Sequence, residues 1–131
     1  MDEKKAINPA SVRRPFGNYS HGLAVPAGAR LLVTSGQLGI GPDDTVPETV
    51  EEQAEICFRS IEAILAEAGM GFEDVIRISG FVTRREDFAP YMAVRDRFTK
   101  EAKAVSTLII VSGFTRPEFL VEVEITAAKV D

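Results

Sequence analysis

The chain has 131 residues, 45% hydrophobic and 27% charged, which is the composition of one ordinary globular domain. Its formal net charge of −5 gives no general attraction for phosphate backbones or anionic lipid, which argues against nucleic-acid and membrane partners. The single cysteine, Cys57, excludes an intrachain disulfide and a cysteine-based zinc site. The charged start has no apolar signal segment, so we expect a cytoplasmic protein.

The first part of the chain predicts an arm followed by a hairpin. Residues 1–15 are polar and contain two prolines, so we expect an extended arm at the start of a single domain spanning residues 1–131. Residues 23–25 and 30–34 are short strand candidates, and the turn at residues 26–29 predicts that they pair with each other. A loop rich in Gly, Pro and Asp follows.

A first helix has clear start and stop signals. Thr49 and Glu52 have the spacing of a capping box, and Gly69 is placed to end the helix. Between them, apolar residues recur at helical spacing and form one stripe. Cys57 lies on this stripe, so we interpret it as a small core residue. The stripe contains Ala54, Cys57, Phe58, Ile61, Ile64, Leu65 and Ala68.

The second half alternates strand and helix. Residues 74–83 are rich in Val, Ile and Phe and predict a strand. A second helix is expected from about residue 87 to residue 102, with its inner side formed by Phe88, Tyr91, Val94, Arg95 and Phe98. Residues 107–112 are apolar at consecutive positions, which predicts a strand buried on both faces.

The last predicted strand, residues 119–128, alternates cleanly. Val121, Val123, Ile125 and Ala127 share one face, and Leu120, Glu122, Glu124 and Thr126 share the other. By pattern alone, the two glutamates indicate a solvated or salt-bridged face.

The predicted order is β-β-α-β-α-β-β, which indicates an α+β fold with one mixed sheet. Two helices cannot cover both faces of about five strands, so we expect both on one face. The apolar strand at residues 107–112 then needs a second layer on the far face. A neighbouring subunit could supply that layer, and so could loops.

Several segments resemble, in order and spacing, the RidA/YjgF family, also called L-PSP. They are Gly17-Asn-Tyr-Ser20, Leu32-Val-Thr-Ser-Gly-Gln37, Glu51-Glu-Gln53, Phe81-Val-Thr83, Asp87-Phe-Ala89 and Val121-Glu-Val-Glu124. The resemblance implies a chorismate-mutase-like fold and a homotrimer with clefts between subunits. It also implies hydrolysis of small-metabolite enamines or imines to 2-oxo acids and ammonia, without a metal or organic cofactor.

The resemblance also suggests site residues. It makes Glu122 the catalytic residue that positions water, with Glu124 a structural neighbour. Tyr19 and the strand end formed by Ser35, Gly36 and Gln37 would line the pocket. His21, the only histidine, is either a surface or core residue or part of the cleft lining, where it could shuttle protons.

Two positions depart from the family pattern. Val105 stands where the family has an arginine that clamps the substrate carboxylate, and Met92 replaces an asparagine often found in the second helix. Arg116, on the loop before the last strand, or Lys103 could return a cation to the cleft. The missing arginine predicts weak or no activity on small 2-imino acids.

Two alternatives to an enzyme of this kind remain open. One is a non-catalytic ligand-binding or regulatory module on the same scaffold. The other is a ribonuclease, which the acidic charge disfavours and for which the sequence has no histidine pair or carboxylate-metal cluster.

Overall fold

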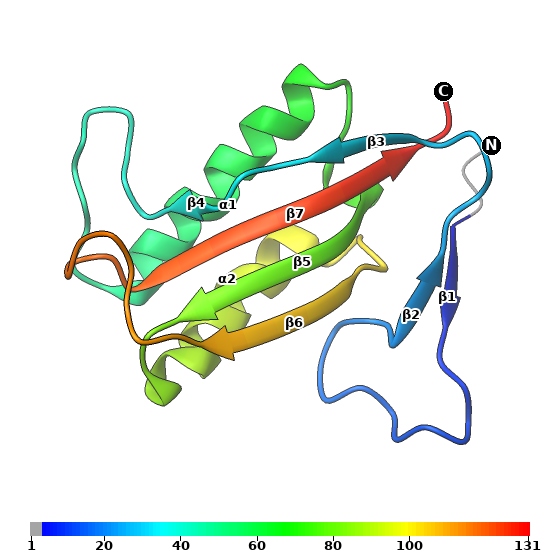
Figure 1. Ribbon diagram of the computed structural model, residues 1–131, viewed down its shortest axis with the longest axis horizontal. Helices are drawn as coiled ribbons and strands as arrows, with labels where there is room; N and C mark the ends of the chain where they lie inside the picture. The colour runs from blue at the N-terminus through cyan, green and yellow to red at the C-terminus, as the bar shows by residue number, and fades with distance from the viewer. Residues whose placement is uncertain (1–3) are drawn as a thin grey trace.

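The computed structural model describes residues 4–131, which form two sheets and two α-helices (Figure 1). Two short 3-10 helices precede β5 and α2, at Phe72–Asp74 and Arg85–Asp87. The remaining elements are β1 (Lys5–Ile7), β2 (Gly22–Ala24), β3 (Arg30–Val33), β4 (Gln37–Leu38), α1 (Val50–Glu67), β5 (Val75–Val82), α2 (Phe88–Thr99), β6 (Val105–Ile110) and β7 (Val121–Lys129).

The main sheet is mixed and has five strands. Its order is β3-β7-β5-β6, with β4 also pairing with β7, and only β5 and β6 run parallel. Both helices lie on the same side of this sheet (Figure 1). The predicted α+β architecture, with two helices on one face, is therefore confirmed. The other face of the sheet carries no layer from the described part of the chain (Figure 1).

The predicted hairpin is wrong. The strand predicted at residues 23–25 pairs with β1 in a separate two-stranded sheet, and β3 pairs with β7. The turn signal is present, since Gly28 has φ 84°, but it joins two sheets instead of reversing one strand onto the next. The nine-residue strand β7 gives β3 a longer partner, and this pairing places Leu32 against the core. Part of the predicted arm, Lys5–Ile7, is the strand β1.

Helix α1 follows its sequence signals. The Thr49 hydroxyl accepts a hydrogen bond from the Glu52 N–H at 3.2 Å, and Gly69 after the last turn has φ 72°. Five of the seven residues of the apolar stripe, all except Ile64 and Ala68, are buried in the core. Burial, followed by the charge of Glu122, raises the pKa of Cys57 to about 12, so the thiol stays protonated and behaves as a core residue.

The boundaries of two later elements differ from the prediction. Helix α2 ends at Thr99, three residues before residue 102, where the Thr99 hydroxyl donates to the Arg95 carbonyl at 2.7 Å. Strand β6 begins at Val105 and ends at Ile110, two residues earlier than predicted at each end. This earlier start brings Val105 into the sheet as the direct partner of Arg77 on β5.

Within one chain, β6 is exposed on the face without helices, so burial of both its faces needs a layer from outside the described chain and stays a prediction. Ile109 is 47% exposed, and Leu31 and Val33 on β3 are 60% and 70% exposed. Both helices lie on the opposite face of the sheet, so neither helix covers these side chains (Figure 1). Large apolar side chains left exposed on the face of a sheet are typical of a surface that meets another protein.

One close contact in the core gives a stability prediction. A Cβ added at Gly80 would lie 2.7 Å from Cζ of Tyr91, whose buried hydroxyl has no hydrogen-bond partner among the described residues. We expect Gly80→Ala to lower the free energy of unfolding by about 1–3 kcal/mol through overpacking. Tyr91→Phe removes the crowding hydroxyl, so the double variant should lose less than Gly80→Ala alone. Denaturant unfolding at one fixed protein concentration measures all three variants; equal losses in the single and double variants would contradict this origin.

Candidate functional site

Glu122 lies at the centre of a paired section of the main sheet. On β7, Glu122 pairs with Leu38 of β4 on one side and with Phe81 of β5 on the other. The residues on either side of it, Val121 and Val123, are fully buried, so the alternation of the strand directs Glu122 to the face without helices. The predicted division of β7 into an apolar and a polar face is confirmed.

Gly36 allows the Glu122 carboxyl group to lie directly against the backbone. A Cβ at Gly36 would be 2.6 Å from Cδ of Glu122, so any larger residue there would displace the carboxyl group from this position. The predicted strand end is therefore next to the glutamate. Gln37 pairs with Val123, and its side-chain amide donates to the Ser35 carbonyl at 3.1 Å, which fixes the segment.

A cavity of about 380 Å³ opens beside Glu122. Leu38 and Phe114 give it apolar walls, and Gly113 and Thr115 complete the lining. A single carboxylate at the wall of a mostly apolar cavity is suited to hold and deprotonate one water molecule.

The environment raises the pKa of Glu122. Burial is the larger cause and the nearby negative charge of Glu124 is the second, since both disfavour the ionised form. A raised pKa makes the carboxylate a stronger base than an ordinary glutamate, which suits proton abstraction from water near neutral pH.

The pKa of Glu122 gives a pH prediction. If the ionised form is required, activity should fall as pH drops through a pKa above that of an ordinary glutamate. Glu124→Gln removes the like charge, so it should lower the pKa of Glu122 and shift the acidic limb of the profile to lower pH. The pH dependence of kcat/KM in wild type and variant measures this shift. Glu55→Gln, on the helix layer, is the control; an unchanged limb in Glu124→Gln would contradict the prediction.

Gln53 positions the loop that walls this cavity, a role that the sequence alone did not reveal. Its fully buried amide donates to the carbonyls of Pro47 and Glu118, both at 2.8 Å. Its Oε1 accepts from the Leu120 N–H at 2.9 Å. The sequence signal that could have indicated this role is a glutamine in the first turn of α1, next to the apolar stripe.

A second group of predicted residues gathers at the start of β6. The Ser20 N–H donates to the Ala104 carbonyl at 3.1 Å, so the loop carrying Tyr19 lies next to Val105. The Tyr19 hydroxyl accepts from the Phe16 N–H at 3.1 Å. The resemblance placed Tyr19 and Val105 in one pocket, and the fold brings their chain segments together.

Arg95 joins helix α2 to this second group. Its guanidinium is 1% exposed and donates to the Ser106 hydroxyl at 2.6 Å and to the Asn18 carbonyl at 3.2 Å. Asp96 accepts from it at 2.8 Å. The sequence placed Arg95 on the inner side of the helix but assigned it no function; a charge among apolar neighbours was the signal.

His21 stabilises the loop between β1 and β2. Its Nε2–H donates to the Arg13 carbonyl, and its backbone N–H donates to Oδ1 of Asn8 at 2.8 Å. Its ring meets Tyr19 edge-on, with ring centroids 6.4 Å apart. These contacts place His21 beside Tyr19 and show that it stabilises the loop.

The two groups are far apart within one chain. Val105 pairs with Arg77, whereas Glu122 is level with Phe81 and Ile109, four residues further along the strands. Four residues of strand span about 13 Å, and two inter-strand spacings separate β6 from β7. A small substrate cannot touch Val105 and Glu122 of the same subunit.

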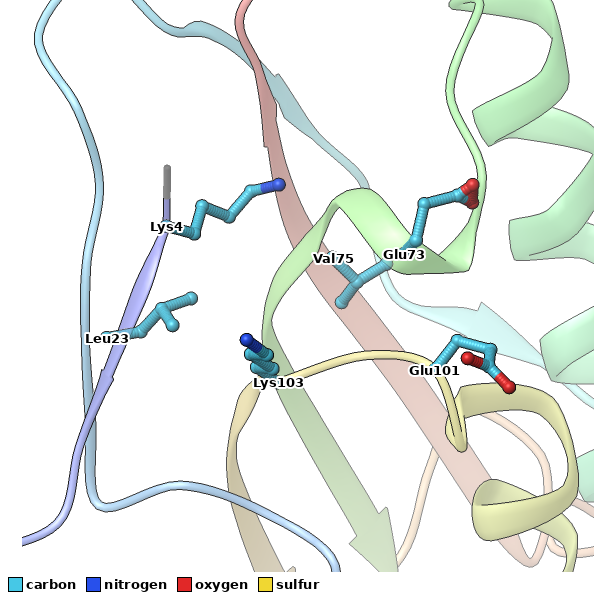
Figure 2. A pocket seen from close by; sticks show the side chains of 6 residues that line it. All are labelled: Lys4, Leu23, Glu73, Val75, Glu101 and Lys103. Carbon is cyan, nitrogen blue, oxygen red and sulfur yellow. The ribbon is translucent and has the colours of Figure 1, made fainter. Parts of the chain in front are cut away.

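The two alternative cations lie elsewhere. Arg116 is 3.6 Å from the Glu118 carboxylate and stacks over the Phe119 ring at 4.6 Å, and it does not line the cavity at Glu122. Lys103 lines a cavity of about 260 Å³ between the β1–β2 sheet and β5. Figure 2 shows the ammonium groups of Lys103 and Lys4 directed into this space, and Lys4 also lies 3.8 Å from Asp74.

Residues 4–131 hold no group of three or more His, Cys, Asp or Glu side chains placed to bind a metal ion. In the same part of the chain, no helix combines the length and the apolar character needed to cross a membrane.

The chain is similar to proteins of one family over almost its whole length. It is 28% identical over 128 residues to a RutC family protein of Pyrococcus abyssi, which covers 96% of this chain and 98% of the relative. It is 29% identical over 102 residues, 77% of each chain, to Escherichia coli TdcF, which is named as a candidate reactive intermediate deaminase.

Solved structures show the same fold. A Rid family protein of unknown function from Yersinia pestis, YyfB, superposes with a TM-score of 0.85 at 24% identity and covers 96% of this chain and 98% of its own. The structure of E. coli TdcF with bound serine gives a TM-score of 0.71 at 27% identity, covering 96% and 99%. The family model described as endoribonuclease L-PSP matches residues 10–129. The chain therefore belongs to the endoribonuclease L-PSP family, which is the RidA/YjgF family that its sequence motifs resemble.

Proposed function

We propose that this protein is a RidA-like hydrolase that deaminates a small enamine or imine, or adds water to a related metabolite. The observation that carries the proposal is the Glu122 carboxyl group. It lies against Gly36 at the wall of a cavity, and its pKa is raised by burial and by Glu124. Similarity to TdcF, a candidate reactive intermediate deaminase by name, supports this reaction class.

In the proposed reaction, Glu122 accepts a proton from water as the water oxygen bonds to the imine carbon. The nitrogen takes up both protons of that water, one returned by Glu122 and one from the hydroxyl group of the carbinolamine. It leaves as ammonia when the carbon–nitrogen bond breaks and the carbonyl forms. The products are a 2-oxo acid and ammonia, so the reaction consumes one water and requires no oxidant or reductant. This chemistry needs only one well-placed base and a held substrate.

The proposed site lies between subunits of a homotrimer. Glu122 and Val105 cannot reach one small molecule within a chain, but they can if two chains each contribute one group. The face of the main sheet without helices exposes the apolar side chains of Leu31, Val33 and Ile109 and is available for such an assembly. A site completed by a second copy accounts for both observations.

Val105 provides the experiment that tests this site. An isopropyl group cannot bind a carboxylate, so the native protein should hydrolyse 2-iminobutanoate slowly. Val105→Arg adds a guanidinium and should raise kcat/KM by about tenfold or more, since a charge-assisted bidentate pair is strong. Formation of 2-oxobutanoate above the spontaneous rate measures this. Equal rates in native protein and variant would refute this role of Val105, and no rate above background in either would refute the hydrolase.

A second function, ligand binding without turnover, is favoured by one specific observation. Val105 stands where the family resemblance leads us to expect an arginine that binds the substrate carboxylate, and the cavity at Glu122 is nevertheless present. This alternative predicts that Glu122→Gln leaves the biological function intact, whereas the hydrolase requires its loss.

A further inference from the structure

Arg77 is an exposed cation at the Val105 end of the main sheet. It pairs with Val105 on β6 and with Thr126 on β7. Directly paired strand residues point to the same face, so Arg77, Val105 and Thr126 form one row on the face without helices. Among the described residues, the Arg77 side chain has no ion pair and no hydrogen-bond partner.

Among residues 4–131, no ionic partner compensates the charge of Arg77. Glu124 is its diagonal neighbour, since Glu124 pairs with Ser79, but the two side chains form no ion pair. The next residues on this face of β5 and β6 are Ser79 and Thr107, which carry no charge, and Phe81 and Ile109 beyond them are apolar. If a second subunit covers this face, an unpaired guanidinium would become buried, which is costly unless an anion meets it.

Val105 leaves space for that anion. Neighbouring strands lie about 4.8 Å apart, and an arginine side chain is longer than this spacing. The Arg77 guanidinium can therefore reach the volume above the short Val105 side chain. The loop carrying Tyr19 borders the same place, because Ser20 is hydrogen bonded to Ala104.

We propose that Arg77 binds the carboxylate of the ligand, from β5, in the volume that the small Val105 side chain leaves open on β6. The proposal deepens the site described under the proposed function and rests on it. It names the ligand class as carboxylic acids. The guanidinium comes from the strand next to Val105, so it holds the carboxylate at a position shifted from the one an arginine at Val105 would give. Acids of different length should therefore differ in affinity from small 2-oxo acids.

Binding measurements test this without requiring turnover. Calorimetric titration with 2-oxobutanoate, 2-oxopentanoate and 2-oxoglutarate should show binding of at least one acid to the native protein, and no binding of 2-oxobutanamide. Arg77→Met keeps the chain length and removes the charge, so it should weaken that binding by about tenfold or more. Arg59→Met, which removes a charge from the outer face of α1, is the matched control and should bind as the native protein does.

A positional exchange distinguishes a ligand role from a structural one. The double variant Arg77→Val with Val105→Arg returns a guanidinium to the same row from β6 and should restore carboxylate binding relative to Arg77→Met. Three results would overturn the proposal. The native protein and Arg77→Met could have equal affinity, or the native protein could bind none of the acids. The exchange variant could also fold without regaining affinity. Loss of assembly in Arg77→Met with unchanged affinity would also overturn it, by making Arg77 a subunit contact.

The same measurements separate this proposal from the hydrolase itself. Glu122→Gln should retain carboxylate binding, because Glu122 is not in the Arg77 row. If the native protein binds an acid through Arg77 but hydrolyses no imine, the proposed reaction fails and the Arg77 site stands. If imines are hydrolysed and Arg77→Met changes neither affinity nor KM, the Arg77 site fails and the reaction stands.

Discussion

Glu122→Gln is expected to reduce imine hydrolysis by at least about a hundredfold, the usual contribution of a positioned general base. The amide keeps the size and shape of the carboxyl group beside Gly36 but cannot accept a proton from water. Because the loss should lie in the chemical step, kcat should fall with little change in KM. Steady-state formation of the 2-oxo acid at a pH well above the pKa of Glu122 measures both parameters.

The stability of the Glu122→Gln variant separates a catalytic role from a structural one. The folded-state pKa of Glu122 is raised, so its ionised form is less favourable in the folded chain than in the unfolded chain. Its contribution to stability is therefore present below the unfolded pKa and is lost as pH rises through the folded pKa. At neutral pH, Glu122→Gln should have an unchanged or slightly higher Tm, whereas a variant with a lower Tm and proportionally lower activity would indicate a structural residue.

Local signals in the sequence were sufficient for most of the fold. Thr49, Glu52 and Gly69 set the limits of α1, and the alternation along β7 assigned its two faces. The hairpin failed for a physical reason. A turn such as the one at Gly28 determines where the chain bends, but which strands pair depends on distant partners, and β3 gains more from the long strand β7.

The site was predictable only in part. Motif resemblance identified Glu122 and Gly36, which the structure places in contact, and also Tyr19 and Val105, whose segments meet at the start of β6. The proximity of Arg77 to Val105 could not be read from the sequence, because it depends on the register between two parallel strands. The predicted start of β6 at residue 107 would have left Val105 outside the sheet.

The role of Gln53 beside the Glu122 cavity also could not be predicted from the sequence. Its amide contacts Pro47 and Glu118, which are 6 and 65 residues away in the chain. No local sequence pattern predicts the hydrogen bond to Glu118, which is 65 residues away. The loop that it fixes carries Phe114, so the wall of the cavity at Glu122 depends on a contact visible only in the folded chain.

Val33→Glu is expected to dissociate the proposed trimer and to abolish activity at the same time. In the single chain Val33 is 70% exposed on the face without helices, so a charge there leaves the chain's own core intact. In an assembly the same charge would be buried in an apolar interface without a partner, which is strongly unfavourable. Light scattering should give three times the 14.3 kDa chain mass for the native protein and one chain mass for the variant.

The coupling of assembly to activity is the decisive part of this prediction. Glu122 and the Val105 row are about 13 Å apart along the strands of one subunit, so in the proposed trimer each subunit supplies one half of each site. Ala66→Glu, which adds the same charge on the exposed side of α1, should leave both mass and activity unchanged. A native protein that is monomeric while active, or a monomeric Val33→Glu variant with full activity, would show that each chain carries a complete site.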